Sequence, residues 1–182
     1  MNIEKIDKVT LVGQSMGGYV CQEFAIQYPE KLSAFVAVDT NPFGYYYYTK
    51  WERYLLTKVG NMASWFPYSI LVRSIAKGAT KTKYAYENLY NAVSRLNKKE
   101  IIFIMNMAYG GFLERKESVK FNFPVLLLVG DSDNTRYVKK YNQKWAKHDG
   151  YSSRFIANSA HNSNVDNYEE FNKITIDFLN NL

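Results

Sequence analysis

Residues 9–20 read VTLVGQSMGGYV, and this stretch decides how the rest of the chain is interpreted. A short apolar run of the β type leads into Gly13, Ser15 follows two residues later, and Gly17 and Gly18 open a helical pattern. The pattern G-x-S-x-G between a strand and a helix is typical of a nucleophile elbow, a sharp turn that lifts a serine hydroxyl clear of a sheet. We expect side chains at Gly13 or Gly17 to collide with neighbouring elements. Ser15 is therefore the candidate nucleophile.

Composition indicates a single domain with a substantial core. The chain has 182 residues, of which 47% are hydrophobic and 16% aromatic. The net charge is +6, but basic and acidic residues alternate through residues 50–147 and form no compact basic block, so nucleic-acid binding is not expected. The one cysteine, Cys21, cannot form an internal disulfide and is interpreted as a buried small apolar residue rather than a reactive thiol.

The sequence also bears on the cellular compartment of the protein. Its first residues, MNIEKIDK, lack the apolar core of a signal peptide. No run reaches the roughly 18 apolar residues that a membrane span requires. We therefore expect a soluble, cytoplasmic protein that does not bind a membrane.

Hydrophobic patterning predicts a parallel sheet of the α/β class. Strands are expected at 9–12, 32–38, 125–129 and 153–157. The near-continuous apolar runs LSAFVAV and VLLLV indicate strands that are covered on both faces. Helices are expected at 19–28, 67–77, 84–96, 98–109, 137–147 and 168–182. Long helical connections between strands favour parallel pairing.

A change of composition after the second predicted strand suggests a helical insertion. Residues 41–97 contain no strand pattern and are predicted to form a cap, whereas residues 1–40 and 98–182 are predicted to form the core. Aromatic side chains are frequent in the insertion, and they offer two interpretations: an acyl- or ring-binding pocket above Ser15, or simple packing against the sheet. These residues are Tyr45, Tyr46, Tyr47, Tyr48, Trp51, Trp65 and Phe66.

A serine nucleophile needs a base within hydrogen-bond reach, and the chain has two histidines. His148 lies at the charged end of a predicted helix, where a surface position or a helix cap explains it. His161 follows the last predicted strand, at the carboxyl end where side chains converge in open parallel sheets. His161 is the candidate base.

An orienting acid has three candidates, each in a loop that follows a predicted strand. Asp39 follows residues 32–38, while Asp131 and Asp133 follow residues 125–129. Each of them has an alternative interpretation as an ordinary turn or capping residue.

Three segments together resemble the α/β-hydrolase family, of the small esterase and lactonase-like kind with a helical cap. LVGQSMGG resembles its nucleophile elbow, VLLLVGDSD its acid turn, and NSAHNSNVDNYEEF its histidine loop and last helix. The resemblance implies Ser15 as nucleophile, Asp133 rather than Asp131 as acid, and His161 as base. It implies the backbone N–H of Met16 as one donor to the oxyanion.

The fold class that this resemblance implies is α/β. It is a partial α/β-hydrolase fold with about four parallel strands, flanking helices and a helical cap after the second strand. Complete members have about four further strands before the elbow strand, where this sequence has eight residues. We therefore expect an internal start or an incomplete gene model, with residues 9–12 as an open edge strand. The second oxyanion donor would be missing, and loss of one donor typically costs about 10²–10³ in turnover.

The expected function is a serine hydrolase that cleaves a carboxylic ester or related acyl bond of a small molecule through an acyl-enzyme. No metal or organic cofactor is implied. The alternative is a catalytically weak or silent fragment whose open edge pairs with another copy or a complementing chain.

Two further details of the sequence bear on the resemblance. Ala160 replaces the usual glycine with little expected consequence, and Asp166 with Glu169 suggests a capping box for the last helix.

Overall fold

The computed structural model describes residues 5–135 and 137–182, so the first four residues of the predicted core segment 1–40 lie outside the described residues. Its sheet has four strands in the order β1-β2-β3-β4, and each neighbouring pair is parallel. The strands are β1 (Val9–Gln14), β2 (Leu32–Val38), β3 (Val125–Gly130) and β4 (Ser152–Ile156). This arrangement confirms the predicted partial parallel fold.

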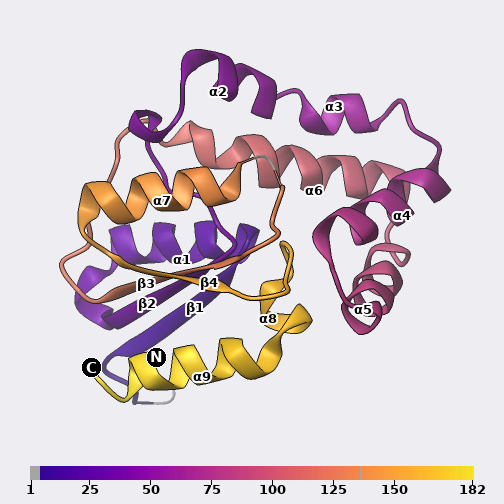
Figure 1. The fold of residues 1–182 in the computed structure, drawn as a ribbon. Coiled ribbons are helices and arrows are strands. Elements are labelled where there is room, and N and C mark those ends of the chain that lie inside the picture. Colours follow the sequence, from indigo (N-terminus) through magenta and orange to yellow (C-terminus); the bar gives the residue numbers. More distant parts are fainter. Residues whose placement is uncertain (1–4, 136) are drawn as a thin grey trace.

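Helices cover both faces of the sheet. Figure 1 shows α1 (Met16–Gln27) and α7 (Val138–Asp149) on one face and α9 (Tyr168–Leu179) on the other. The short helix α8 (Ser163–Asp166) precedes α9. The segment between β2 and β3 carries α2 (Lys50–Leu56), α3 (Val59–Ala63), α4 (Tyr68–Ala79), α5 (Lys83–Val93) and α6 (Lys98–Gly110). Short 3-10 helices lie at Pro29–Lys31, Tyr45–Tyr47 and Gly111–Glu114.

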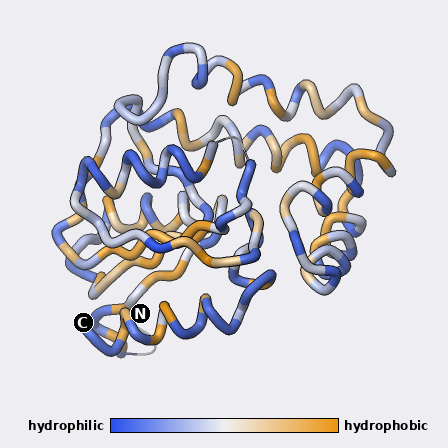
Figure 2. The backbone as a smooth tube through the Cα atoms, in the orientation of Figure 1, coloured by the Kyte–Doolittle hydropathy of each residue, from blue (hydrophilic) through white to orange (hydrophobic). Residues whose placement is uncertain are grey.

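The core follows the alternation of side chains along the two central strands. Phe35 and Leu127 point into the layer beneath α1 and α7, together with Trp145 of α7. Their neighbours Val36 and Leu128 point to the opposite face and pack against α9. Figure 2 shows the strands as the most continuous hydrophobic part of the tube. Two covered faces explain why β2 and β3 read as unbroken apolar runs.

The helices between β2 and β3 have a small core of their own. Ala63, Leu71, Val72 and Ile101 are buried together, which joins α3, α4 and α6. The segment contains no strand, as predicted. The division into a cap of 41–97 and a core resuming at 98 stays a prediction. Throughout the described residues, no helix has the length and apolar character needed to cross a membrane.

Close packing against neighbouring atoms explains two of the glycines in the elbow. A Cβ at Gly13 would lie 2.7 Å from Cys21 Sγ and 2.7 Å from the Cα of Gly18. A Cβ at Gly18 would lie 2.5 Å from the side chain of Thr40. The expectation for Gly17 was wrong, because a Cβ there meets nothing within 4 Å. Both glycines lie in the first turn of α1, which begins at Met16. Gly18 faces Thr40 in the segment after β2, whereas Gly17 faces away from it.

The capping box expected for the last helix was also wrong. Asn167, not Asp166, caps α9, and its side chain accepts a hydrogen bond from Glu170 N. Glu170 rather than Glu169 returns to this cap by accepting from the Asn167 side chain. Asp166 instead accepts hydrogen bonds from distant backbone, as described below.

Replacement of Gly18 by alanine should destabilise the fold by about 1–3 kcal/mol, because the added methyl group overlaps the side chain of Thr40, whose hydroxyl is held by its hydrogen bond to Ser15 O. The matched change Gly17→Ala should be neutral or stabilising by up to about 1 kcal/mol, since alanine favours a helix. Urea unfolding of both variants measures the difference. Equal stabilities would contradict the packing described here.

Candidate active site

Ser15 occupies a strained turn between β1 and α1. Its φ of 49° and ψ of −118° lie where non-glycine residues are rarely found. Two hydrogen bonds hold the turn in this conformation: Ser15 N donates to Val38 O at 2.8 Å, and Thr40 Oγ1 donates to Ser15 O at 2.7 Å. These bonds therefore hold the strained turn and place the hydroxyl at the carboxyl edge of the sheet.

The structure brings Ser15, His161 and Asp133 together, although they lie on three different loops. Ser15 Oγ lies 2.8 Å from His161 Nε2. His161 Nδ1 lies 2.9 Å from Asp133 Oδ2. These loops follow β1, β4 and β3, whose carboxyl ends share one edge because the strands are parallel. The result is a continuous chain of hydrogen bonds from hydroxyl to carboxylate.

The Asp133 carboxylate determines which groups donate and which accept in this series of hydrogen bonds. The Asp133 side chain is fully buried, and Thr135 N donates to its other oxygen at 2.7 Å. A carboxylate accepts hydrogen bonds, so the neutral imidazole of His161 donates from Nδ1. Nε2 is then left as the acceptor for the Ser15 hydroxyl.

The other two acid candidates bind backbone and serine groups of neighbouring loops, whereas the imidazole is bonded to Asp133. Asp131 accepts from Asn158 N and Ser159 N in the loop before His161. Asp39 accepts from Gly130 N through Oδ1 and from Ser163 N and Oγ through Oδ2. Both carboxylates therefore position the histidine loop.

Charges around the base set its proton affinity. Burial by itself lowers the pKa of His161, but the hydrogen bond and charge of Asp133 and the charge of Asp39 outweigh it, so the pKa is raised. Burial raises the pKa of Asp39 to about 7, although the nearby His161 and the hydrogen bond from Ser163 act in the opposite direction. The imidazole of His161 thus gains a proton more readily than that of an ordinary histidine.

The side chain of Gln14 joins the elbow directly to the backbone of His161, a contact that no sequence pattern predicted. Gln14 Nε2 donates to the backbone oxygen of His161 at 2.7 Å. A glutamine at the end of an edge strand gives no sequence signal for this, because its partner lies 147 residues away.

Cys21 and His148, the other two residues with reactive or titratable side chains considered above, lie outside this hydrogen-bonded series. Cys21 is half-buried beneath Gly13, and burial raises the pKa of its thiol, which disfavours the reactive thiolate. His148 lies in the last turn of α7, where Nδ1 is 2.6 Å from the buried carboxylate of Asp149.

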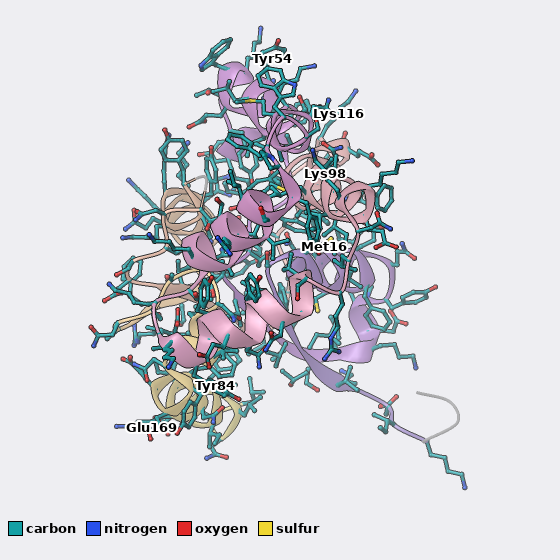
Figure 3. All side chains as sticks on the ribbon, turned by 90° about the vertical axis from the view of Figure 1, so that its right-hand side faces the viewer. Met16, Tyr54, Tyr84, Lys98, Lys116 and Glu169 are labelled. Atoms are coloured by element: carbon teal, nitrogen blue, oxygen red, sulfur yellow. The ribbon has the colours of Figure 1, made fainter. Side chains whose placement is uncertain are left out.

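A cavity of about 1120 Å³ opens above Ser15 and His161. Met16, whose backbone N–H belongs to the first turn of α1, lies on its wall beside them. Figure 3 views the molecule from the side of α4 and α5 and shows Met16 near the middle of the molecule. The lining from α4, α5 and α6 is mostly aliphatic, although Ser74 and Tyr109 also belong to it: Leu71 and Ile75 of α4, Leu89 and Val93 of α5, and Ile101, Ile104 and Met105 of α6.

Most of the aromatic residues expected in the pocket lie elsewhere. Of that group, Phe66 alone lines the cavity. Trp51 and Trp65 are 66% and 81% exposed, whereas Tyr47 and Tyr48 are buried in the core beneath α7. The interpretation as packing was therefore right for the tyrosines at 47 and 48. Within residues 5–135 and 137–182, no group of His, Cys, Asp or Glu side chains could hold a metal ion.

Comparison with known proteins identifies the family. A family model described as alpha/beta hydrolase fold matches residues 1–168, so the chain belongs to the α/β-hydrolase family. No curated protein matches the chain. Solved structures share the fold.

A thermophilic esterase is 21% identical, with a TM-score of 0.74 over 98% of this chain and 68% of its own. An N-acyl homoserine lactone degrading enzyme is 19% identical, with a TM-score of 0.71 over 97% of this chain and 70% of its own. An esterase from Exiguobacterium antarcticum is 16% identical, with a TM-score of 0.70 over 98% of this chain and 69% of its own.

Asp39→Asn should lower the pKa of His161, because the negative charge that favours the imidazolium is removed. A reaction that needs the neutral base gains rate as pH rises through this pKa, so the acidic limb of kcat/KM should move to lower pH. Asp131→Asn is the matched control, since Asp131 binds the same loop without raising the pKa of His161. An unmoved limb in Asp39→Asn, or an equal shift in both variants, would contradict this electrostatic role.

Proposed function

We propose that this protein is a serine hydrolase that cleaves a carboxylic ester or a related acyl bond through an acyl-enzyme. One observation carries the proposal: the Ser15 hydroxyl, the His161 imidazole and the Asp133 carboxylate form a hydrogen-bonded chain, with steps of 2.8 Å and 2.9 Å, at the floor of a large cavity. Membership of the α/β-hydrolase family supports it. No cofactor takes part in the proposed chemistry.

In the first half of the reaction, Ser15 Oγ attacks the carbonyl carbon while His161 Nε2 takes the hydroxyl proton. Asp133 holds the ring orientation and stabilises the imidazolium. The carbonyl oxygen becomes an oxyanion, for which the Met16 N–H at the start of α1 is the proposed donor. Collapse of the tetrahedral intermediate breaks the bond to the leaving group, which takes the proton from His161.

In the second half, water attacks the acyl-enzyme. His161 removes a proton from the water as it adds to the acyl carbon, and a second tetrahedral intermediate forms. Its collapse releases the acid and returns the proton to Ser15 Oγ. The raised pKa of His161 suits both of its roles, since the group must accept and then donate a proton.

The cavity favours substrates with an apolar group. Its far wall is built from aliphatic side chains of α4, α5 and α6, and burial of a hydrocarbon chain there contributes about 0.8 kcal/mol per CH₂. We therefore propose esters with an apolar acyl or alcohol group as the substrate class.

Hydrolysis of p-nitrophenyl esters tests the proposal. Ser15→Ala and His161→Ala should each lower kcat by about 10³-fold or more, and Asp133→Asn should lower it by a similar factor. A fluorophosphonate probe should label wild type at Ser15. Ser33→Ala, at an exposed serine of β2, is the matched control and should retain activity and labelling. Folded wild-type protein that is neither active nor labelled would rule out an autonomous enzyme.

A second candidate function rests on the position of β1 in the sheet. Among the described residues, β1 pairs with β2 alone, and Val12 on this edge strand is 50% exposed. Unpaired strand edges are templates for pairing with another chain. The alternative proposal is therefore a catalytically silent hydrolase domain that binds a second copy or a complementing chain along β1.

Light scattering during size exclusion separates these states. If β1 pairs between copies, wild type should elute as a dimer or larger, and Val12→Lys should elute as a folded monomer because an edge lysine opposes pairing. A wild-type monomer that remains stable at micromolar concentration would contradict self-association.

A further inference from the structure

The turn between α4 and α5 lies against the loop that carries His161, although about 80 residues separate them in sequence. Asn162 N donates to Ala79 O at 2.8 Å, directly beside the base. Lys81 Nζ donates to Ser132 Oγ at 2.6 Å in the acid turn. Figure 1 shows α8, which continues the histidine loop, between the sheet and α5. The insertion is thus joined to the site at this turn.

One carboxylate provides most of that junction. Asp166 is 9% exposed, and its Oδ1 accepts from Lys81 N at 2.9 Å, from Thr82 N at 2.8 Å and from Thr82 Oγ1 at 3.1 Å. Its Oδ2 accepts from Lys81 N at 3.0 Å and from Ala160 N at 2.9 Å. These bonds nearly exhaust the acceptor capacity of a carboxylate.

Local helix capping does not account for Asp166. Asn167 caps α9, and the partners of Asp166 on the turn lie 84 and 85 residues earlier in the sequence. Its remaining partner, Ala160, immediately precedes His161. The carboxylate therefore connects the turn of the insertion with the backbone at the base.

The same turn joins the two helices that form part of the cavity wall. Leu71 and Ile75 of α4 and Leu89 and Val93 of α5 line the cavity together with His161. We propose that Asp166 is a positioning residue that holds this α4–α5 wall in a fixed place relative to His161. Its kinetic consequence rests on the proposed hydrolase function, whereas the contact itself does not.

The expected effect depends on the length of the substrate. We expect a short acyl group at Ser15 to depend little on the aliphatic wall, whereas a long acyl chain must lie against it. Release of the wall should therefore impair long-chain esters more than acetyl esters, through a higher KM and a lower kcat/KM. A role in stability alone would reduce both substrates by the same factor.

The test compares Asp166→Ala and Asp166→Asn with Asp177→Asn, a control that removes the same charge from an exposed position on α9. For Asp166→Ala, we expect kcat/KM to fall about tenfold more with p-nitrophenyl octanoate than with the acetate. Asp166→Asn keeps one acceptor oxygen and should be intermediate. Hydrogen exchange should accelerate together in peptides covering residues 79–85 and 157–166, and nowhere else.

Each outcome decides the proposal. Equal loss with both esters, or unchanged exchange in folded Asp166→Ala, would overturn it. If wild type hydrolyses neither ester, the proposed function fails, and the exchange experiment still tests the junction. If Asp166→Ala does not fold, Thr82→Ala replaces it with Thr82→Ser as control, because serine keeps the hydroxyl that donates to Asp166. The same exchange pattern is then expected for Thr82→Ala alone, and its absence overturns the proposal.

Discussion

The strained backbone of Ser15 is the constraint on which the rest of the site depends. A φ of 49° with a ψ of −118° costs about 1–3 kcal/mol and persists because its surroundings hold it. Thr40 and Val38 bind the two sides of this peptide, and Gly18 leaves the room that Thr40 needs. Because the turn is held in this conformation, the Ser15 hydroxyl lies at the carboxyl edge of the sheet, opposite His161.

Carboxylates hold the histidine loop opposite this turn. Asp131, Asp39 and Asp166 each accept backbone N–H groups from residues 158–163, while Gln14 binds the carbonyl of His161. The N–H groups of Ala160 and Ser163 are buried and must be paired, so Asp166 and Asp39 fix the backbone on both sides of His161. The imidazole is thereby directed to Asp133, whose own turn is closed by a backbone N–H. The positions of His161 and Ser15 follow from hydrogen bonds to backbone rather than from the contacts among Ser15, His161 and Asp133 alone.

The parts of this arrangement that depend on local patterns were predictable. The first three strands follow from apolar runs, and Ser15 follows from a motif whose strand and helix are adjacent in sequence. Predictions failed where the deciding partner is distant. Gly17 and Gly18 look alike until Thr40 is placed beside the helix. Asp166 has the sequence context of a cap, yet its partners are on the α4–α5 turn. The exposure of Trp65 depends on how the helices between β2 and β3 pack, which periodicity does not reveal.

The most direct measurement of the central claim is a crystal structure of the protein after reaction with a fluorophosphonate. We expect phosphorus bonded to Ser15 Oγ, with the elbow still at positive φ, His161 Nε2 beside the modified oxygen and a phosphonyl oxygen within hydrogen-bond distance of Met16 N. Phosphonylation of another residue in folded protein, or a modified Ser15 whose phosphonyl oxygen points away from Met16 and whose imidazole has left Asp133, would contradict it.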